Sequence, residues 1–166
     1  LHIAPFFHGG VGNVSLNLTK AFAKIGCEVI LATPTKIPRQ IKKFVTQYYT
    51  LRAPTLKGPF YVIQFYSLNH VRIESIVKLE KPDALLTHGP LVLATRFIRD
   101  IPVISIVHGT YANEIKWMWQ HPIFGFDRAR YITSIYASHR LDMKLYKYVT
   151  KFSNIYLVAV SKNTRK

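Results

Sequence analysis

The sequence LHIAPFFHGGVGNVSLNLTKAFAKI, residues 1–25, is the strongest indication of how this chain folds. Residues 1–6 are mostly apolar and predict a short strand, and residues 7–12 hold the glycines of a turn. A helix is predicted after this turn, and Gly26 stands where a left-handed C-cap would end it. The β-branched run at residues 27–33 predicts a second strand, so the chain opens with a βαβ unit and a parallel pair. Apolar residues of the helix recur at the spacing of one buried face: Val14, Leu18, Ala21, Phe22 and Ile25.

The glycine turn is a candidate anion site. A turn between a strand and a helix leaves backbone N–H groups free at the helix N-terminus, which favours a phosphate. This position is occupied by Gly9, Gly10, Val11 and Gly12. Their pattern is not G-x-G-x-x-G, and it is not a P-loop either, because no lysine follows the glycines directly. A tight turn also needs glycine for steric reasons alone. A phosphate site and a purely structural turn are therefore both open interpretations.

Composition limits the class of protein. The 166 residues correspond to about one domain. The 23 Lys and Arg against 8 Asp and Glu give a net charge of +15, which implies an anionic partner, a missing acidic partner or simply a basic surface. Cys27 is the single cysteine, which fits a reducing compartment, and we expect it to be a small core residue. No apolar run approaches the roughly 18 residues of a membrane span, so we expect a cytoplasmic protein.

The rest of the chain continues the α/β alternation. Strands are predicted at residues 45–53, 83–88, 101–108 and 155–160, and helices at residues 60–80, 91–99 and 127–150, with a short one at 114–119. Residues 60–66 also have the composition of a strand, and length favours one long helix over a strand followed by a short helix. Residues 34–44 read as a basic loop. The predicted fold class is α/β: a Rossmann-like, doubly wound parallel sheet with helices on both faces. Both ends look cut, so we expect residues 1–166 to be a single domain, truncated at both ends, of a longer protein.

Histidines follow two of the predicted strands. His88-Gly89 and His108-Gly109 stand at carboxyl ends of strands, where parallel sheets bind ligands, and the glycine turn after the first strand should lie on the same edge. His108 is the strongest polar candidate, because its imidazole could donate a hydrogen bond to a phosphate or a sugar hydroxyl; the alternative is a core histidine. His8, beside the glycine turn, could meet substrate or solvent. The seven histidines lack metal-ligand spacing, so no metal site is predicted.

Residues 110–153 are rich in aromatic and basic side chains. Such a composition suits packing, an anionic membrane surface or single-stranded nucleic acid, and the sequence does not separate the three.

Four segments together resemble the N-terminal domain of group 1 glycosyltransferases, the retaining family-4 nucleotide-sugar enzymes of the GT-B fold. They are PFFHGGVGNVSLNLTKAFAKIGCEVILAT, KPDALLTHG, IPVISIVHG and IYLVAVSKNTRK, and their order and spacing cover nearly the whole chain. Each motif is weak alone, and the combination is fairly specific.

The resemblance implies roles for particular residues. Gly9, Gly10 and Val11 would approach the donor diphosphate through backbone N–H groups. His108 would be the catalytic histidine near the donor phosphates and the reacting sugar. Ser161 matches the serine that closes the domain, a mostly structural role. His8, His88 and Gly109 are further expected substrate contacts, and they follow from their positions beside the glycine turn and at the strand ends rather than from the resemblance.

The resemblance also implies what this chain lacks. The family binds the nucleotide-sugar mainly on a C-terminal domain with an Arg/Lys pair and an E-x7-E element, which these residues do not contain. The chain would be the acceptor-side half, inactive alone, of an enzyme that transfers a hexose from a nucleoside-diphosphate sugar to an acceptor hydroxyl with retention. The nucleotide-sugar is a substrate, so no cofactor and no metal are expected.

The expected partners are the nucleoside-diphosphate sugar, a sugar or lipid-linked acceptor, the C-terminal domain and an anionic membrane surface at the inner face; no nucleic acid is expected. The alternative is a non-catalytic basic α/β module that binds RNA or an anionic membrane.

Overall fold

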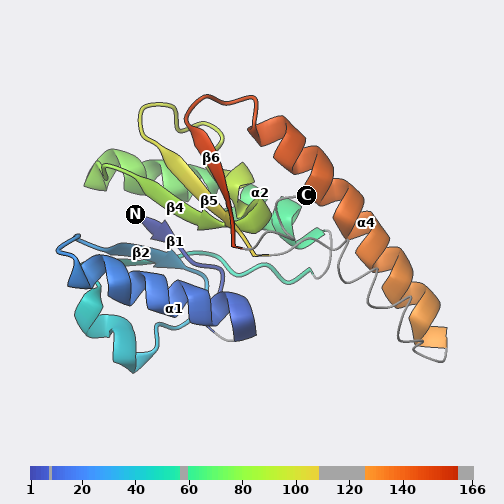
Figure 1. The fold of residues 1–166 in the computed structure, drawn as a ribbon, viewed down its shortest axis with the longest axis horizontal. Helices are drawn as coiled ribbons and strands as arrows, with labels where there is room; N and C mark the ends of the chain where they lie inside the picture. The colour runs from blue at the N-terminus through green and yellow to red at the C-terminus, as the bar shows by residue number, and fades with distance from the viewer. Residues whose placement is uncertain (8, 57–59, 109–125, 161–166) are drawn as a thin grey trace.

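The computed structural model describes residues 1–7, 9–56, 60–108 and 126–160, and the side chains of residues 126–131 lie outside this description (Figure 1). Its strands form one six-stranded sheet in the order β3-β2-β1-β4-β5-β6, with every neighbouring pair parallel. The strands are β1 (His2–Ile3), β2 (Ile30–Thr33), β3 (Gln47–Thr50), β4 (Leu85–His88), β5 (Val103–Val107) and β6 (Ile155–Ala159).

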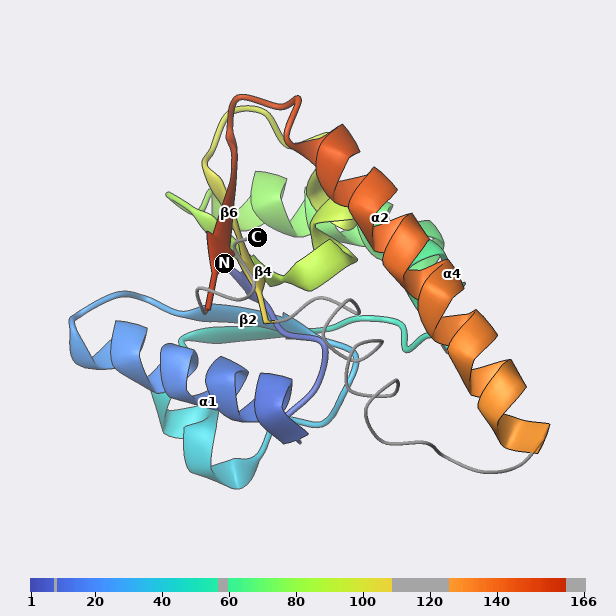
Figure 2. The same ribbon diagram turned by 45° about the vertical axis from the view of Figure 1, so that its right-hand side comes forward.

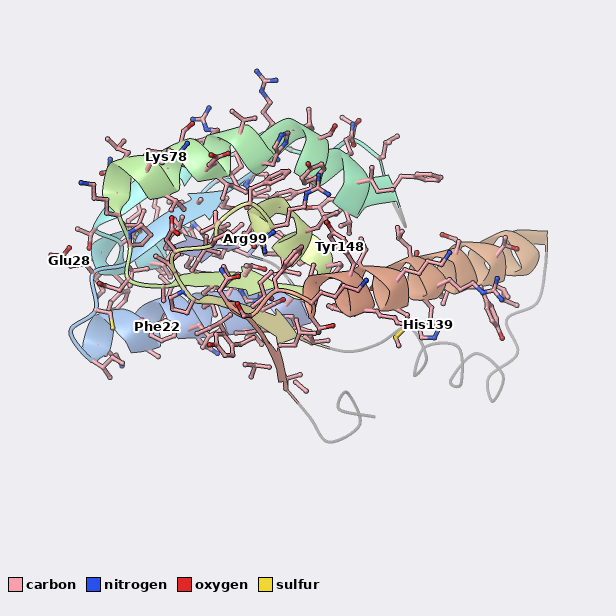
Figure 3. All side chains as sticks on the ribbon, turned by 90° about the horizontal axis from the view of Figure 1, so that it is seen from above. Phe22, Glu28, Lys78, Arg99, His139 and Tyr148 are labelled. Carbon is pink, nitrogen blue, oxygen red and sulfur yellow. The ribbon has the colours of Figure 1, made fainter. Side chains whose placement is uncertain are left out.

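Helices cover both faces of this sheet. Helix α1 (Gly9–Lys24) and the 3-10 segment η1 (Arg39–Phe44) lie on one side, while α2 (Phe60–Glu80) and the 3-10 segment η2 (Gly89–Thr95) lie on the other (Figures 1 and 2). Figure 3 shows the two layers from above, with Phe22 on α1 and Lys78 on α2 at opposite sides of the sheet. The predicted doubly wound α/β fold is confirmed.

Each face has its own hydrophobic core, because successive residues of a strand point to opposite sides. Ile3 packs with the larger core under α2 and η2, whereas Ala4 packs with the smaller core under α1. The larger core includes Phe65, Ile73 and Val92, all fully buried. Burial of apolar surface in these two layers, at roughly 25 cal/mol per Å², is the main force holding the sheet between its helices.

Helix α4 (Phe126–Val149) joins the larger core by its C-terminal end. Val149 is fully buried and Tyr146 packs against the same cluster. The rest of the helix extends past the edge of the sheet, with His139 labelled well outside the main body (Figure 3). In the described residues, no helix is both long and apolar enough to cross a membrane.

Most predicted elements are confirmed, although the strands are shorter than expected. The helix predicted at residues 60–80 has the observed bounds, and the helix predicted at 127–150 is α4. The helix predicted at residues 91–99 is instead η2, and η1 lies inside the predicted basic loop. The short helix expected at residues 114–119 lies outside the described residues. Gly26 is the left-handed C-cap, with φ of 89°, and the Cys27 N–H donates back to the Phe22 carbonyl at 3.0 Å.

Two sequence-based expectations about burial were wrong. Strand β2 begins at Ile30, so Cys27 lies in the preceding connection and is exposed rather than in the core. The buried side of α1 was also misassigned: Ile25 is 74% exposed, and the residues buried on α1 are Gly12, Ser15, Leu16 and Thr19. The physical reason is that the sheet beneath α1 presents imidazoles as well as apolar side chains, so small hydroxyl residues face it.

Gly12 allows the first turn of α1 to approach the preceding chain. A Cβ atom at this position would lie 2.5 Å from the backbone carbonyl carbon of Phe7, which no rotamer change can relieve. At Gly10, in contrast, an added Cβ meets nothing within 4 Å.

We therefore predict that G12A lowers the free energy of unfolding by about 1–3 kcal/mol, the usual cost of overpacking. The matched variant G10A should leave stability unchanged or slightly higher, because alanine favours helix over glycine. Urea unfolding followed by circular dichroism measures both. Equal stability of the two variants would show that the close approach of Gly12 to Phe7 is not a constraint.

Candidate functional site

The candidate site lies at the carboxyl ends of β4 and β5, next to the first turns of α1. His88 is the last residue of β4, and His108 directly follows β5. Their ring nitrogens, His88 Nδ1 and His108 Nε2, are 2.6 Å apart, and the rings stack with centroids 4.9 Å apart. The sheet thus brings together the two strand-end histidines that the sequence analysis selected.

A third histidine extends this pair into the interior. His2 on β1 places its Nε2 atom 2.7 Å from Nε2 of His88, and its Nδ1 atom lies 3.1 Å from the Thr19 hydroxyl on α1. The Ser15 hydroxyl lies 3.2 Å from the same His88 Nε2. A continuous hydrogen-bonded chain therefore runs from α1 through His2 and His88 to His108, and we call these five residues the histidine chain.

The inner two rings of the histidine chain are more buried than the outer one. His2 and His88 are each only 3% exposed, whereas His108 is half-buried. Burial disfavours the charged imidazolium, so it lowers the pKa of all three rings. The pKa of His88 falls to about 3, mainly through burial and further through the neighbouring His108. At neutral pH the three rings are therefore uncharged.

The turn after His88 is also held in place. The buried Ser105 hydroxyl of β5 donates to the Gly89 carbonyl at 2.8 Å, and Gly89 has a left-handed φ of 56°. This contact ties the end of β4 to the neighbouring strand, so His88 and His108 are fixed relative to each other by both sheet pairing and a side chain.

The glycine turn lies at the same edge as the histidines. The structure begins α1 at Gly9, so Gly9, Gly10 and Val11 form its first turn, with Gly9 at φ of 66°. Gly9 and Gly10 are exposed and Val11 is half-buried. The Val11 carbonyl accepts a hydrogen bond from the Ser15 hydroxyl at 3.0 Å, which links this turn to the histidine chain. The predicted shared edge is confirmed for these residues, while His8, Gly109 and Ser161 lie outside the described residues.

The histidine chain does not form a metal site. Its ring nitrogens face one another in pairs at 2.6 and 2.7 Å, which is hydrogen-bond spacing and leaves no room for an ion between them. Within residues 1–7, 9–56, 60–108 and 132–160, no group of His, Cys, Asp and Glu side chains is arranged to hold a metal ion.

Sequence reasoning missed three members of this site: His2, Ser15 and Thr19. His2 was grouped with scattered histidines, because its proximity to His88 follows from strand order and not from sequence spacing. Ser15 and Thr19 did carry a signal, since they stand four residues apart and therefore share one side of the helix. A polar pair on a helix that must cover a sheet indicates polar groups beneath it.

The fold and this edge together define a class of protein: a Rossmann-like α/β domain with polar groups collected at the carboxyl ends of its strands. Comparison with known proteins identifies the family. A model described as Glycosyltransferase Family 4 matches residues 8–166, and the chain belongs to this family.

Other comparisons add little. No curated protein sequence matches the chain. Among solved structures, a Listeria monocytogenes protein described as a UDP-N-acetylglucosamine 2-epimerase aligns at 12% identity with a TM-score of 0.47. The alignment covers 99% of this chain and 40% of that one, so the present chain spans well under half of its length.

The low pKa of His88 gives a testable link between pH and stability. The unfolded chain, with a histidine pKa near 6.5, takes up a proton as the pH falls, whereas folded His88 stays neutral down to about pH 3. Stability attributable to His88 is therefore present above pH 6.5 and is lost on acidification. Between pH 7 and pH 5 this loss amounts to about 2 kcal/mol.

We predict that H88N, which keeps a polar side chain but cannot titrate, loses less stability than the wild type over this interval, by about that amount. Urea unfolding at the two pH values measures both proteins. An H88N curve parallel to that of the wild type would contradict the assignment.

Proposed function

We propose that this chain is the acceptor-side domain of a retaining glycosyltransferase that transfers a hexose from a nucleoside-diphosphate sugar to an acceptor hydroxyl. The observation that carries the proposal is the family match over residues 8–166. In this proposal residues 1–166 form one domain, and a separate C-terminal domain supplies most of the nucleotide-sugar contacts. The family match does not favour the alternative of a non-catalytic basic binding module.

The geometry of the strand-end edge supports the proposal. In a glycosyl transfer, negative charge develops on the departing diphosphate, and preorganised N–H groups stabilise it. The exposed first turn of α1 offers backbone N–H groups at Gly9, Gly10 and Val11, reinforced by the positive end of a 16-residue helix. His108, half-buried at the neighbouring strand end, would contact the reacting sugar.

The remaining site residues have supporting roles in this proposal. His88 would act mainly through His108, since it is buried and bonded to it. His8 and Gly109 would add substrate contacts beside the glycine turn and after β5. The nucleotide-sugar enters as a substrate, so the proposed reaction requires neither a cofactor nor a metal ion.

The proposal is tested with the protein produced from its complete gene. UDP-, GDP- and ADP-sugars are incubated with a lipid extract as acceptor source, and nucleoside diphosphate release is measured. We expect turnover of at least one donor, and H108A should lower kcat/KM by about 100-fold or more, as loss of a group acting on the transition state does.

The matched control is H70A. His70 lies on α2, stacked on Tyr66 with ring centroids 4.6 Å apart, away from the strand-end edge, and its loss should leave kcat/KM close to wild type. Absence of turnover with every donor would contradict the transferase proposal. Near-normal activity of H108A would remove this histidine from the mechanism.

We further propose that the acceptor is anionic or lies on an anionic membrane surface at the inner face. The net charge of +15 supports this, since each Lys or Arg near such a surface contributes about 1 kcal/mol. Among the described residues, the ion pair of Lys78 with Glu74 at 2.8 Å is the single one between a basic and an acidic side chain. Most of the positive charge is thus not neutralised locally.

Vesicle co-sedimentation tests this surface association. The protein should pellet with phosphatidylglycerol vesicles at low salt, and raising the ionic strength should release it, because screening weakens such attraction. Pure phosphatidylcholine vesicles are the control and should leave the protein in the supernatant. No binding to the anionic vesicles at low salt, or equal binding to both, would contradict the proposal.

A further inference from the structure

We propose that Thr19, His2, Ser15 and His88 are positioning residues that fix His108 as the neutral tautomer protonated on Nε2. The unprotonated Nδ1 atom of His108 is then a hydrogen-bond acceptor. The proposal rests on the number of protons available to the histidine chain. Its consequence for activity depends on the proposed function, but the tautomer itself does not.

The first constraint comes from Thr19. Its hydroxyl has one proton, and it lies 2.9 Å from the Ser15 carbonyl oxygen, which can only accept. The proton is used there, so the same oxygen must accept from Nδ1 of His2 at 3.1 Å. Because neutral His2 carries one ring proton, its Nε2 atom is left unprotonated.

The second constraint comes from Ser15, and it determines the proton of His88 without reference to Thr19. Its hydroxyl donates to the Val11 carbonyl at 3.0 Å, so its oxygen accepts from Nε2 of His88 at 3.2 Å. His88 must therefore carry its proton on Nε2. That proton also faces the Nε2 atom of His2 at 2.7 Å, the atom that the Thr19 argument leaves unprotonated.

These two constraints determine the state of His108. With its proton on Nε2, neutral His88 presents an unprotonated Nδ1 atom to Nε2 of His108 at 2.6 Å. His108 must donate there, so its proton is on Nε2 and its Nδ1 atom carries a lone pair. Two hydroxyls on α1 thereby determine the tautomer of a ring at the far end of the chain.

Reversing all the proton positions in the histidine chain would break two hydrogen bonds. If every imidazole took the opposite tautomer, the Thr19 and Ser15 hydroxyls would have to turn their protons to the rings. The Ser15 and Val11 carbonyls would then lose the bonds observed at 2.9 and 3.0 Å. The Thr19 bond to the Ser15 carbonyl is buried, so water cannot easily replace it, whereas the Ser15 bond to the Val11 carbonyl is only partly buried.

The tautomer changes what His108 can bind. The sequence alone suggests that this imidazole donates to a phosphate or a sugar hydroxyl. As a neutral ring whose proton is already donated to His88, it instead accepts, through Nδ1, from a ligand group that carries a proton. A hydroxyl satisfies this requirement and a fully ionised phosphate oxygen does not.

Two-bond nitrogen–proton correlation NMR tests the proposal, because protonated and unprotonated ring nitrogens have well-separated nitrogen shifts. The full-length protein is labelled with nitrogen-15, and the His108 signals are assigned by their loss in H108Q. In the wild type at pH 7.5 we expect His108 protonated on Nε2 alone and His2 on Nδ1 alone. Either ring in the other tautomer, or His108 as a mixture, would overturn the proposal.

The double variant S15A/T19V removes both hydroxyl constraints with little change in shape. We expect His108 to become a mixture of tautomers, with averaged nitrogen shifts, and kcat to fall several-fold. The matched control is T95V: Thr95 is also fully buried and donates to a backbone carbonyl, that of Val92 at 2.8 Å, but on η2 without a histidine partner. It should keep the wild-type tautomer and activity.

If S15A/T19V keeps the pure Nε2 tautomer, the hydroxyls do not set the state of His108 and the proposal is wrong. If the double variant does not fold, the wild-type spectrum alone still decides the tautomer. If the spectra agree with expectation but no donor is turned over, the histidine chain stands and the proposed function fails.

Discussion

The burial of two imidazoles, those of His2 and His88, between the sheet and α1 is the constraint on which the site depends. A buried polar ring without hydrogen-bond partners is costly, by roughly 1–3 kcal/mol for each unpaired group. The rings satisfy one another in part, and Ser15 and Thr19 supply the remaining partners. Helix α1 is therefore held by these polar contacts as well as by apolar packing of Leu16, and its first turn lies at the strand-end edge.

This arrangement connects the interior of the domain to the strand-end edge. Apolar packing on the α2 face holds the sheet rigid, while the α1 face carries a hydrogen-bonded path from the core to His108. Hydrogen bonds in a low-dielectric interior are stronger and less exchangeable than those at a surface. The ring orientation and proton position of His108 are thus determined by buried residues that no substrate would touch.

The sequence predicted the sheet and the strand-end histidines because both depend on local signals: β-branched runs, prolines and His-Gly pairs. The helix at residues 60–80 was favoured by its length alone, since residues 60–66 also have the composition of a strand. Prediction from the sequence failed where tertiary context decides. Apolar periodicity placed Ile25 on the buried side of α1, yet that side faces imidazoles and is lined by Ser15 and Thr19. The role of His2 could not be predicted either, since it requires knowing that β1 lies beside β4.

We propose that the first turn of α1 and His108 form one binding edge for a nucleoside-diphosphate sugar. The most direct test of this edge is an NMR titration of the full-length protein with the donor that it turns over, following the Gly9 and Gly10 amides and the His108 ring. These signals should shift together with one dissociation constant while the Gly26 amide, at the opposite end of α1, stays in place. Saturable donor binding that leaves the Gly9, Gly10 and His108 signals unchanged would contradict this proposal.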